Sequence, residues 1–552
     1  MNPISFLRNA MKNAPWLVMA IAIHVIIIVV LGIMYVAKEK PKQKEEAVQI
    51  SISKPREDLP VEEIKPEEID RKAIPKNDEN EIVTFEEDVY IPTTETVPED
   101  LHLDRGDPTS MDDVTTGGTT GGTAIGVGTG GHHGTRPSPF GGRKLGTTKK
   151  GRAGGPTEGT EKAVLEGLRW LIRHQNPDGS WSATNLKDRC NPDSPCYDSK
   201  DEFHPLYDEG LTSLAILCFL GAGYSHESKQ TIVDTVQAKR HKVGEVIKNG
   251  LMWLTKRQDA DGHFTRDKAF MYNEALATMA LAEAYGLTQN RYWKDPAQKG
   301  VDFIQRAQRP NPSGNGLWGW RYQSRMEVED FRKTGTDAAA SKEVFDADTS
   351  VTTWCVMALK SAQLSGLTVK KESMDGALEF IKWVTADNGM VGYIDPKGAG
   401  ATVTGKNDHF KYHPTVMSAL GMCSRIFITH DPDDPFLDLA AKQVINDLPT
   451  VSKDKLSIDY YYWYYGSLAL NQYDGPDSPK KSNKYWGPWN KAMVESVISL
   501  QNTEEKTCRR GGWTTMDRWA YTGGPIYTTA INVLTLEVYY RYENAFGGSK
   551  RN

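Results

Sequence analysis

Cysteine is scarce in this sequence. The chain has six cysteines among 552 residues, and no two of them stand in the Cys-x-x-Cys spacing of a zinc finger. This usage excludes a fold that depends on a disulfide framework. Cys190 and Cys196 share one predicted loop, and they could form a disulfide in an oxidising compartment. Cys218, Cys355 and Cys423 fall within predicted helices and are interpreted as small buried hydrophobic residues.

An excess of positive charge is also lacking. The chain has 66 Lys and Arg against 72 Asp and Glu, a net charge of −6 at pH 7, and its basic residues are dispersed. Proteins that bind nucleic acid normally carry a basic patch or stripe, so nucleic acid is not expected as a partner. Hydrophobic residues make up 39% of the chain, which is enough for a large core.

The chain instead has an internal repeat after residue 160. Each of six copies consists of an apolar-periodic helix, a turn and a second helix, and most turns contain Gly followed by an aromatic residue. The fifth copy lacks the Gly turn. Asp-Gly and Asn-Gly stop a helix and reverse the chain. The expected helix pairs are 163–172 with 207–224, 246–254 with 270–287, 300–307 with 346–367, 375–384 with 412–427, 436–448 with 457–473, and 491–500 with 526–542.

These helix pairs predict a closed ring. Twelve helices in six pairs cannot each bury an apolar face alone, but they can do so with one helix of each pair inside the ring and one outside. The expected fold of residues 161–545 is therefore an all-α (α/α)6 toroid of six helix pairs.

The turns carry a recognisable motif. A Gln-x(2–5)-Gly-x-Trp pattern resembles the QW motif of squalene–hopene and related triterpene cyclases, and in looser form that of protein prenyltransferase β subunits. The resemblance covers about residues 160–545 and implies an α/α barrel whose second helices line a central cavity. Enzymes and non-enzymes share such a fold, so it does not by itself imply an activity. The instances are Gln175 with Trp181, Gln501 with Trp513, and, with Phe in place of Trp, Gln258 with Phe264.

Two carboxylates mark the start of the predicted helix 346–367. Class II triterpene cyclases carry Asp-x-Asp-Asp-Thr-Ala at such a start, where the middle Asp protonates an alkene. This chain reads Asp-Ala-Asp-Thr-Ser, so the resemblance implies catalytic roles for Asp346 and Asp348, with Asp348 in the proton donor's place. The next Asp of the motif is absent. Capping of the helix N-terminus is the alternative role for both residues.

A metal site is a second interpretation of the same segment. Prenyltransferase β subunits bind zinc through an Asp-x-Cys pair and a His that follows a Tyr. The resemblance implies a zinc site of Asp346, Asp348 and His413, the last in a Tyr-His pair. Carboxylates and imidazole are acceptable zinc ligands, although the Cys of the motif is replaced here. The non-enzymatic interpretation requires no cofactor.

The predicted inner helices are rich in aromatic residues, including six in succession at 460–465. Aromatic faces stabilise carbocations in terpene cyclases and also suit an apolar ligand such as an isoprenoid, or a peptide. Core packing is the alternative. The predicted ligand-binding residues are Trp354, Tyr412, Tyr461, Trp463 and Tyr527.

The N-terminal part predicts a membrane anchor and a tether. After a basic segment at 1–15, residues 16–36 carry no charge. At about 1.5 Å per residue they are long enough to cross a bilayer core of about 30 Å. No small-residue cleavage site follows, which indicates an anchor rather than a signal peptide. Residues 37–160 are Pro/Glu/Lys-rich, then Gly/Thr-rich, and predict a disordered linker.

His24 lies inside the predicted anchor, where a polar side chain is costly and suggests a function. The basic segment, the span with one His and the Lys/Pro/Glu-rich sequence after it resemble TonB-type energy-transducing proteins. The resemblance implies that His24 contacts an ExbB/ExbD-type proton channel. It also implies a single-pass inner-membrane protein with a periplasmic C-terminal domain. A plain count of flanking Lys and Arg favours the opposite orientation.

Two classes of function follow. In the first, a membrane-anchored envelope protein binds an apolar ligand or a protein partner in its barrel and is coupled through its anchor to a proton-channel complex. In the second, the barrel is a degenerate class II triterpene cyclase, an isomerase or lyase, or a zinc-dependent prenyltransferase. The missing Asp and Cys of the two family motifs favour the first class.

Overall fold

The computed structural model describes residues 143, 154–191, 195–197, 203, 205–265, 270–333, 346–396, 409–514, 517–542 and 544–546. The predicted anchor at 16–36, His24 and nearly all of the predicted linker lie outside these residues. In the part of the chain that is described, every helix is too short or too polar to span a bilayer.

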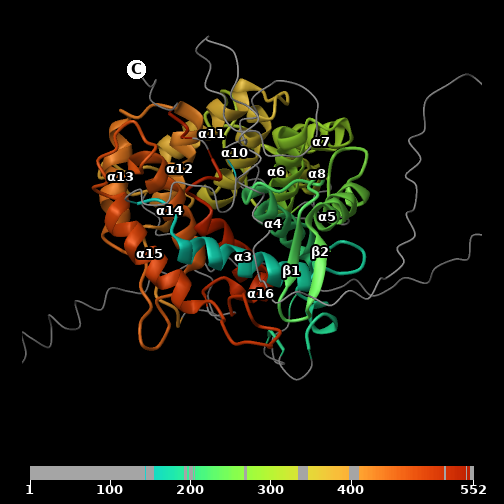
Figure 1. The fold of residues 1–552 in the computed structure, drawn as a ribbon. Coiled ribbons are helices and arrows are strands. Elements are labelled where there is room, and N and C mark those ends of the chain that lie inside the picture. The colour runs from blue at the N-terminus through green and yellow to red at the C-terminus, as the bar shows by residue number, and fades with distance from the viewer. Residues whose placement is uncertain are drawn as a thin grey trace, which may run out of the picture. The chain divides into compact units, whose positions relative to one another are not determined.

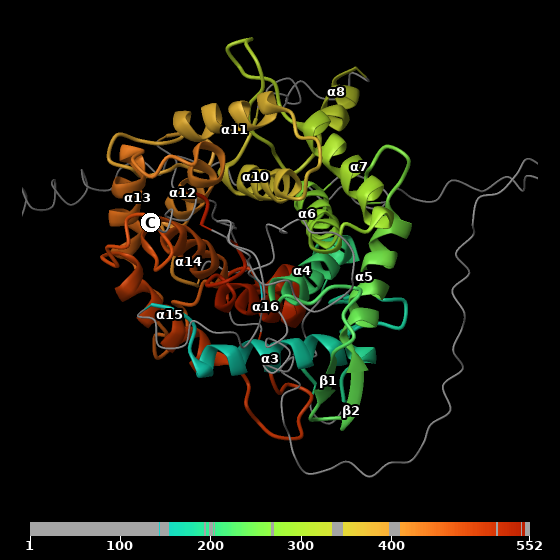
Figure 2. The same cartoon turned by 45° about the horizontal axis from the view of Figure 1, so that its top comes forward.

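The described helices form two concentric layers (Figures 1 and 2). The outer helices are α3 (Glu158–Arg173), α5 (Val243–Arg257), α7 (Arg291–Ala307), α11 (Lys371–Trp383), α13 (Pro435–Ile445) and α15 (Trp486–Leu500). The inner helices are α4 (Asp208–Gly221), α6 (Met271–Thr288), α10 (Thr349–Leu364), α12 (Val416–Thr429), α14 (Tyr460–Asp474) and α16 (Ala520–Leu536).

The inner helices contact one another in the order α4, α6, α10, α12, α14, α16, and α16 contacts α4, so the ring is closed. Inner helices such as α6 are buried on nearly all sides, whereas the outer helix α7 buries one face. The expected ring of helix pairs is thus confirmed for the described residues.

Three connections contain elements that the repeat pattern did not predict. The strands β1 (Thr231–Asp234) and β2 (Lys239–Lys242) form an antiparallel hairpin between α4 and α5. A further helix, α8 (Arg325–Lys333), precedes α10. Two short 3-10 helices, η2 (Leu186–Asp188) and η3 (Pro205–Tyr207), lie between α3 and α4.

The motif glutamines join each repeat to the next. The side-chain amide of Gln175 donates to a carbonyl of its own turn and to one of α5, both at 2.9 Å. Gln258 and Gln308 make the same pair of bonds in their repeats. Gln501 of the last repeat donates to the carbonyl of Ala163 in α3 at 2.8 Å. The motif therefore closes the ring as well as linking neighbours.

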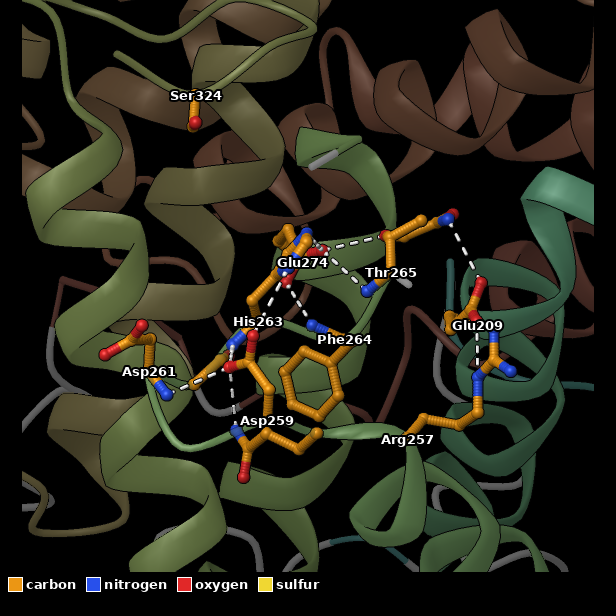
Figure 3. Close-up of polar contacts among 12 residues, drawn as sticks. Glu209, Arg257, Asp259, Asp261, His263, Phe264, Thr265, Glu274 and Ser324 are labelled. Atoms are coloured by element: carbon orange, nitrogen blue, oxygen red, sulfur yellow. Dashed lines mark hydrogen bonds and ion pairs between the residues drawn. The ribbon is translucent and has the colours of Figure 1, made fainter. Parts of the chain in front are cut away.

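The motif aromatics are held by the inner helices. The backbone N–H groups of Trp181, Trp320 and Trp513 each donate to a threonine hydroxyl of the following inner helix. In the second repeat the acceptor is a carboxylate instead, because Phe264 donates to Glu274 at 3.0 Å (Figure 3). Each turn is thus anchored to an inner helix whose first residues it helps to position.

Glu283, in the C-terminal half of α6, is the centre of a buried network of charged residues. Glu283 of α6 accepts from Arg143 at 2.6 Å and from Arg541 at 3.2 Å. The three side chains are at most 1% exposed. Arg143 belongs to the predicted linker, and the structure describes it in contact with the ring.

Candidate functional site

The inner helices all begin at one end of the ring, called here the N-terminal face. Contacts between successive helix starts show this arrangement. Tyr272 at the start of α6 lies beside Ser350 of α10, and the backbone N–H of Tyr460 at the start of α14 donates to Asp517 before α16 at 3.2 Å. The N-terminal face is where the sequence places its candidate catalytic and ligand-binding residues.

Half-buried aromatic side chains surround part of this face. Tyr207 and Phe270 have ring centroids 5.5 Å apart, and Phe270 and Tyr272 have centroids 5.4 Å apart. Aromatic pairs at such spacings are attractive beyond the area they bury. The set, called the aromatic band below, consists of Tyr207, Phe270, Tyr272, Tyr322, Tyr461 and Trp519.

Hydroxyl groups connect the band across the ring. Ser350 lies 2.6 Å from the Tyr272 hydroxyl and 2.5 Å from the Tyr461 hydroxyl, oxygen to oxygen. The indole N–H of Trp354 donates to the same Tyr461 oxygen at 3.2 Å. Burial raises the pKa of Tyr461 above its usual value, so the phenol stays neutral at physiological pH. Two of the predicted ligand-binding residues, Trp354 and Tyr461, therefore lie together.

Asp346 and Asp348 meet at the guanidinium of Arg321. The Nε atom of Arg321 lies 3.2 Å from Asp346, and its Nη1 atom lies 3.6 Å from Oδ2 of Asp348. Asp348 also caps α10 by accepting from the Val351 N–H at 2.8 Å. Burial raises the pKa of Asp348 to about 6, although Arg321 acts in the opposite direction.

This environment bears on the chemistry of Asp348. A carboxyl group with a pKa near 6 can exchange a proton close to neutral pH, which suits general acid–base catalysis. It is a weaker acid than an ordinary carboxyl group, whereas direct protonation of an alkene calls for a stronger one. Its Oδ2 atom accepts no hydrogen bond from the described residues. Arg321 was not predicted as a site residue.

The predicted metal set is not brought together. Nδ1 of His413 lies 2.6 Å from a carboxylate oxygen of Asp447, and Nε2 lies 3.1 Å from the carbonyl of Ser457. Both ring nitrogens face hydrogen-bond acceptors, so neither directs a lone pair at a metal. Among the described residues, His413 forms no group of metal-ligand atoms with Asp346 and Asp348.

The other three predicted ligand-binding residues differ in how far they are exposed. Tyr412 is half-buried, and the guanidinium carbon of Arg518 lies 5.7 Å from its ring centroid. Trp463 is fully buried and packs edge to face on Tyr460 at 5.6 Å. Tyr527 is 9% exposed. Tyr412 is thus accessible, whereas Trp463 belongs to the core.

A group of metal-ligand atoms does occur elsewhere. His174, Cys190, Cys196 and Cys508 are buried, and one ligand atom of each lies within 4.8 Å of all the others. Such a set can hold a metal such as zinc. None of the six cysteines is in a disulfide. Local spacing did not reveal this group, because its members come from both ends of the ring domain.

No protein-family model matches the sequence, and no curated protein is significantly similar to it. Solved structures match at low similarity. A type II terpene cyclase from Scytonema is 13% identical, with 69% of this chain and 97% of that chain covered and a TM-score of 0.42. An inactive α-1,6-mannanase variant from Salegentibacter is 12% identical, with 69% and 99% covered and a TM-score of 0.42. A protein from Actinoplanes is 13% identical, with 69% and 99% covered and a TM-score of 0.41.

Proposed function

We propose that this protein is a membrane-anchored envelope protein whose ring binds an apolar ligand, or an apolar segment of a protein partner, at the N-terminal face. The observation that carries the proposal is the aromatic band. Its rings are large, adjacent and half-buried, so part of each ring remains accessible to an apolar ligand.

The hydrogen bonds of the band support binding. Because Ser350 links the hydroxyls of Tyr272 and Tyr461, these rings are already ordered before a ligand arrives. Preordered side chains lose less entropy when a ligand binds. The phenol and indole groups also supply polar contacts at the edge of an otherwise apolar surface.

The charges of the face indicate which ligands it favours. Asp346 and Asp348 share the single guanidinium of Arg321, which leaves the trio with one negative charge when both carboxyls are ionised. An anionic ligand, such as the diphosphate of a prenyl donor, would be repelled there. Beside Arg321 this balance favours an uncharged group over a diphosphate, although Arg518 places a second guanidinium 5.8 Å from the ring centroid of Trp519.

Binding is expected to depend on Tyr461. Geranylgeraniol, an uncharged isoprenoid, serves as the probe, and tryptophan fluorescence of the full-length protein follows its titration. Replacement Tyr461→Ala removes one ring of the band and its bond to Ser350, so we expect about tenfold weaker binding. Tyr292→Ala is the matched control, because Tyr292 is 52% exposed on the outer helix α7. Equal losses in both variants, or no binding by the wild type of either this probe or an uncharged hydrophobic peptide, would contradict the proposal.

The enzyme remains the second candidate, and one observation favours it. Asp348 combines full burial, a pKa of about 6 and an Oδ2 atom without a hydrogen bond from the described residues. Such a group is suited to general acid–base catalysis in a water-poor site, although its raised pKa makes it a weaker acid than direct protonation of an alkene calls for. The incubations with geranylgeraniol therefore include product analysis by mass spectrometry. Cyclised product that Asp348→Asn eliminates would support a cyclase-like enzyme, and unchanged geranylgeraniol would argue against it.

The anchor completes the proposal and rests on the sequence alone. Residues 16–36 are proposed to hold the protein in the inner membrane, with His24 in contact with a proton-channel complex of the ExbB/ExbD type. We expect His24→Ala to abolish co-purification with that complex from detergent-solubilised membranes. His241→Ala, a change in the hairpin between α4 and α5, is the control and should leave co-purification intact. Undiminished co-purification of the His24→Ala variant would rule out the contact.

A further inference from the structure

We propose that His174, Cys190, Cys196 and Cys508 form a closed Zn²⁺ site that clamps the first repeat of the ring to the last. The site is separate from the aromatic band and does not depend on the proposed ligand-binding function. It takes a single zinc ion as a structural cofactor.

The distances fit one tetrahedral ion. With zinc–sulfur bonds of about 2.3 Å and a zinc–nitrogen bond of about 2.0 Å, the nitrogen–sulfur edges of the tetrahedron are about 3.5 Å. Nε2 of His174 lies 3.4 Å from the sulfur of Cys196, 3.6 Å from that of Cys190 and 3.2 Å from that of Cys508. Three thiolates and one imidazole form a ligand set typical of structural zinc.

The histidine is oriented for coordination. Its Nδ1 atom lies 2.7 Å from the carbonyl oxygen of Trp170. A carbonyl only accepts, so Nδ1 carries the proton and the lone pair of Nε2 is directed at the three sulfurs. The imidazole also stacks on the Trp170 ring, with centroids 3.9 Å apart. Both contacts hold the ring in place, as outer-sphere contacts do in known zinc sites.

The same compactness excludes two alternatives. Ligand atoms within 4.8 Å of one another leave room for one ion but not for an iron–sulfur cluster. A disulfide would use only two of the three sulfurs and would leave the third thiol and His174 without a common function. Because all four positions are filled by the protein, no position is open for a substrate, and the role is structural.

The ligands come from the two repeats that meet where the ring closes. His174 follows α3, and Cys190 and Cys196 lie between α3 and α4 in the first repeat. Cys508 lies between α15 and α16 in the last repeat. A zinc ion here cross-links segments that are far apart in sequence, which restricts the unfolded chain as a long-range disulfide does.

A buried arginine holds the segment that carries Cys508. Arg173, whose guanidinium is paired with Asp234 at 2.5 Å, donates to the carbonyls of Cys508 at 3.2 Å and Arg510 at 2.6 Å. A cleft of about 350 Å³ borders the group and is lined by Arg173, Arg189, Cys190, Lys506 and Cys508 among others. This cleft supplies the entry path that a buried metal site needs.

Metal analysis tests the proposal on the full-length protein, purified under reducing conditions without added metal. We expect about one zinc ion per chain, and after exchange with Co²⁺ the absorption of tetrahedral cobalt–thiolate coordination. Cys196→Ser and Cys508→Ser should each lose most of the zinc. Cys355→Ala is the matched control, because Cys355 is fully buried in α10 and outside the group. If the serine variants fail to fold, the cobalt spectrum of the wild type decides.

The clamp itself has a separate readout. Removal of zinc by a chelator should lower the thermal midpoint by about 5 °C or more. It should also raise hydrogen exchange in α3 and α15, which contact each other, but not in α10 and α12. A wild type that stays metal-free after incubation with zinc, a disulfide among the three cysteines in the intact mass, or equal zinc loss in Cys355→Ala would overturn the proposal.

Discussion

Replacement of Glu283 by glutamine is expected to destabilise the ring by about 3–5 kcal/mol. Glu283 is fully buried and is paired with Arg143 at 2.6 Å and Arg541 at 3.2 Å, both also buried. The amide of glutamine keeps the size of the side chain but removes the charge. Two guanidinium groups would then share a dry site without their counter-charge, and this unpaired charge is the source of the loss.

The loss should depend on pH. Burial alone would raise the pKa of Glu283, but Arg143 and Arg541 outweigh it, and the folded-state pKa lies below the ordinary 4.5. A depressed carboxyl pKa contributes stability that is complete above the unfolded-state value and is lost as pH falls through the folded-state value. The difference between wild type and Glu283→Gln should therefore be constant near neutral pH and shrink below about pH 4.5.

Urea unfolding followed by circular dichroism measures this difference. Glu537→Gln is the matched control, because Glu537 is also buried beside Arg541, at 4.0 Å, but burial raises its pKa where the arginines lower that of Glu283. The amide should therefore remove less charge at Glu537 and cost less stability than at Glu283. Equal costs for the two variants at neutral pH would show that the Glu283 charge is not what stabilises the network.

The helix pairs could be predicted from the sequence because each is encoded locally. Helix 270–287, expected from its apolar periodicity, is α6 at Met271–Thr288. The break before the last inner helix was also encoded locally. That helix was expected from residue 526, and within α16 the backbone is non-helical at Gly524, with a φ of 55°, so a short helical segment from Ala520 is separated by a kink from the main helix after Pro525. Gly-Pro therefore marks a break in the structure as it does in the sequence.

The candidate sites were only partly predictable, because their partners lie far away in the sequence, in a long connection or in another repeat. Asp348 was found from its place at a helix start, but nothing local indicates that Arg321, in the preceding turn, reaches it. The proposed zinc ligands show even more clearly why local sequence does not reveal a site. Cys190 and Cys508 become neighbours only because the ring closes, so a search for local Cys spacing misses them. Closure was expected from the repeats, and pairing the loops of the first and last repeats would have found the group.

Ring closure leads to the second large expected effect, at Gly511. This glycine has a φ of +85°, and a Cβ atom there would overlap the backbone carbonyl of Glu166 in α3. Alanine in this left-handed backbone conformation is less stable than glycine by roughly 1–2 kcal/mol. Overlap with a backbone atom adds about 1–3 kcal/mol, because α3 and the segment after α15 that carries Gly511 must move apart. We expect Gly511→Ala to lose about 2–5 kcal/mol of unfolding free energy.

Gly314→Ala separates the two contributions. Gly314 has nearly the same φ, +84°, but no atom lies within 4 Å of where its Cβ would be. It should therefore show the backbone cost alone, so the difference between the variants reports the packing of the last repeat on the first. Hydrogen exchange should rise in α3 and α15 for Gly511→Ala and stay unchanged for Gly314→Ala. Equal stability losses would mean that the contact between Gly511 and Glu166 does not hold the ring closed, and that closure depends on Gln501 and the zinc ligands instead.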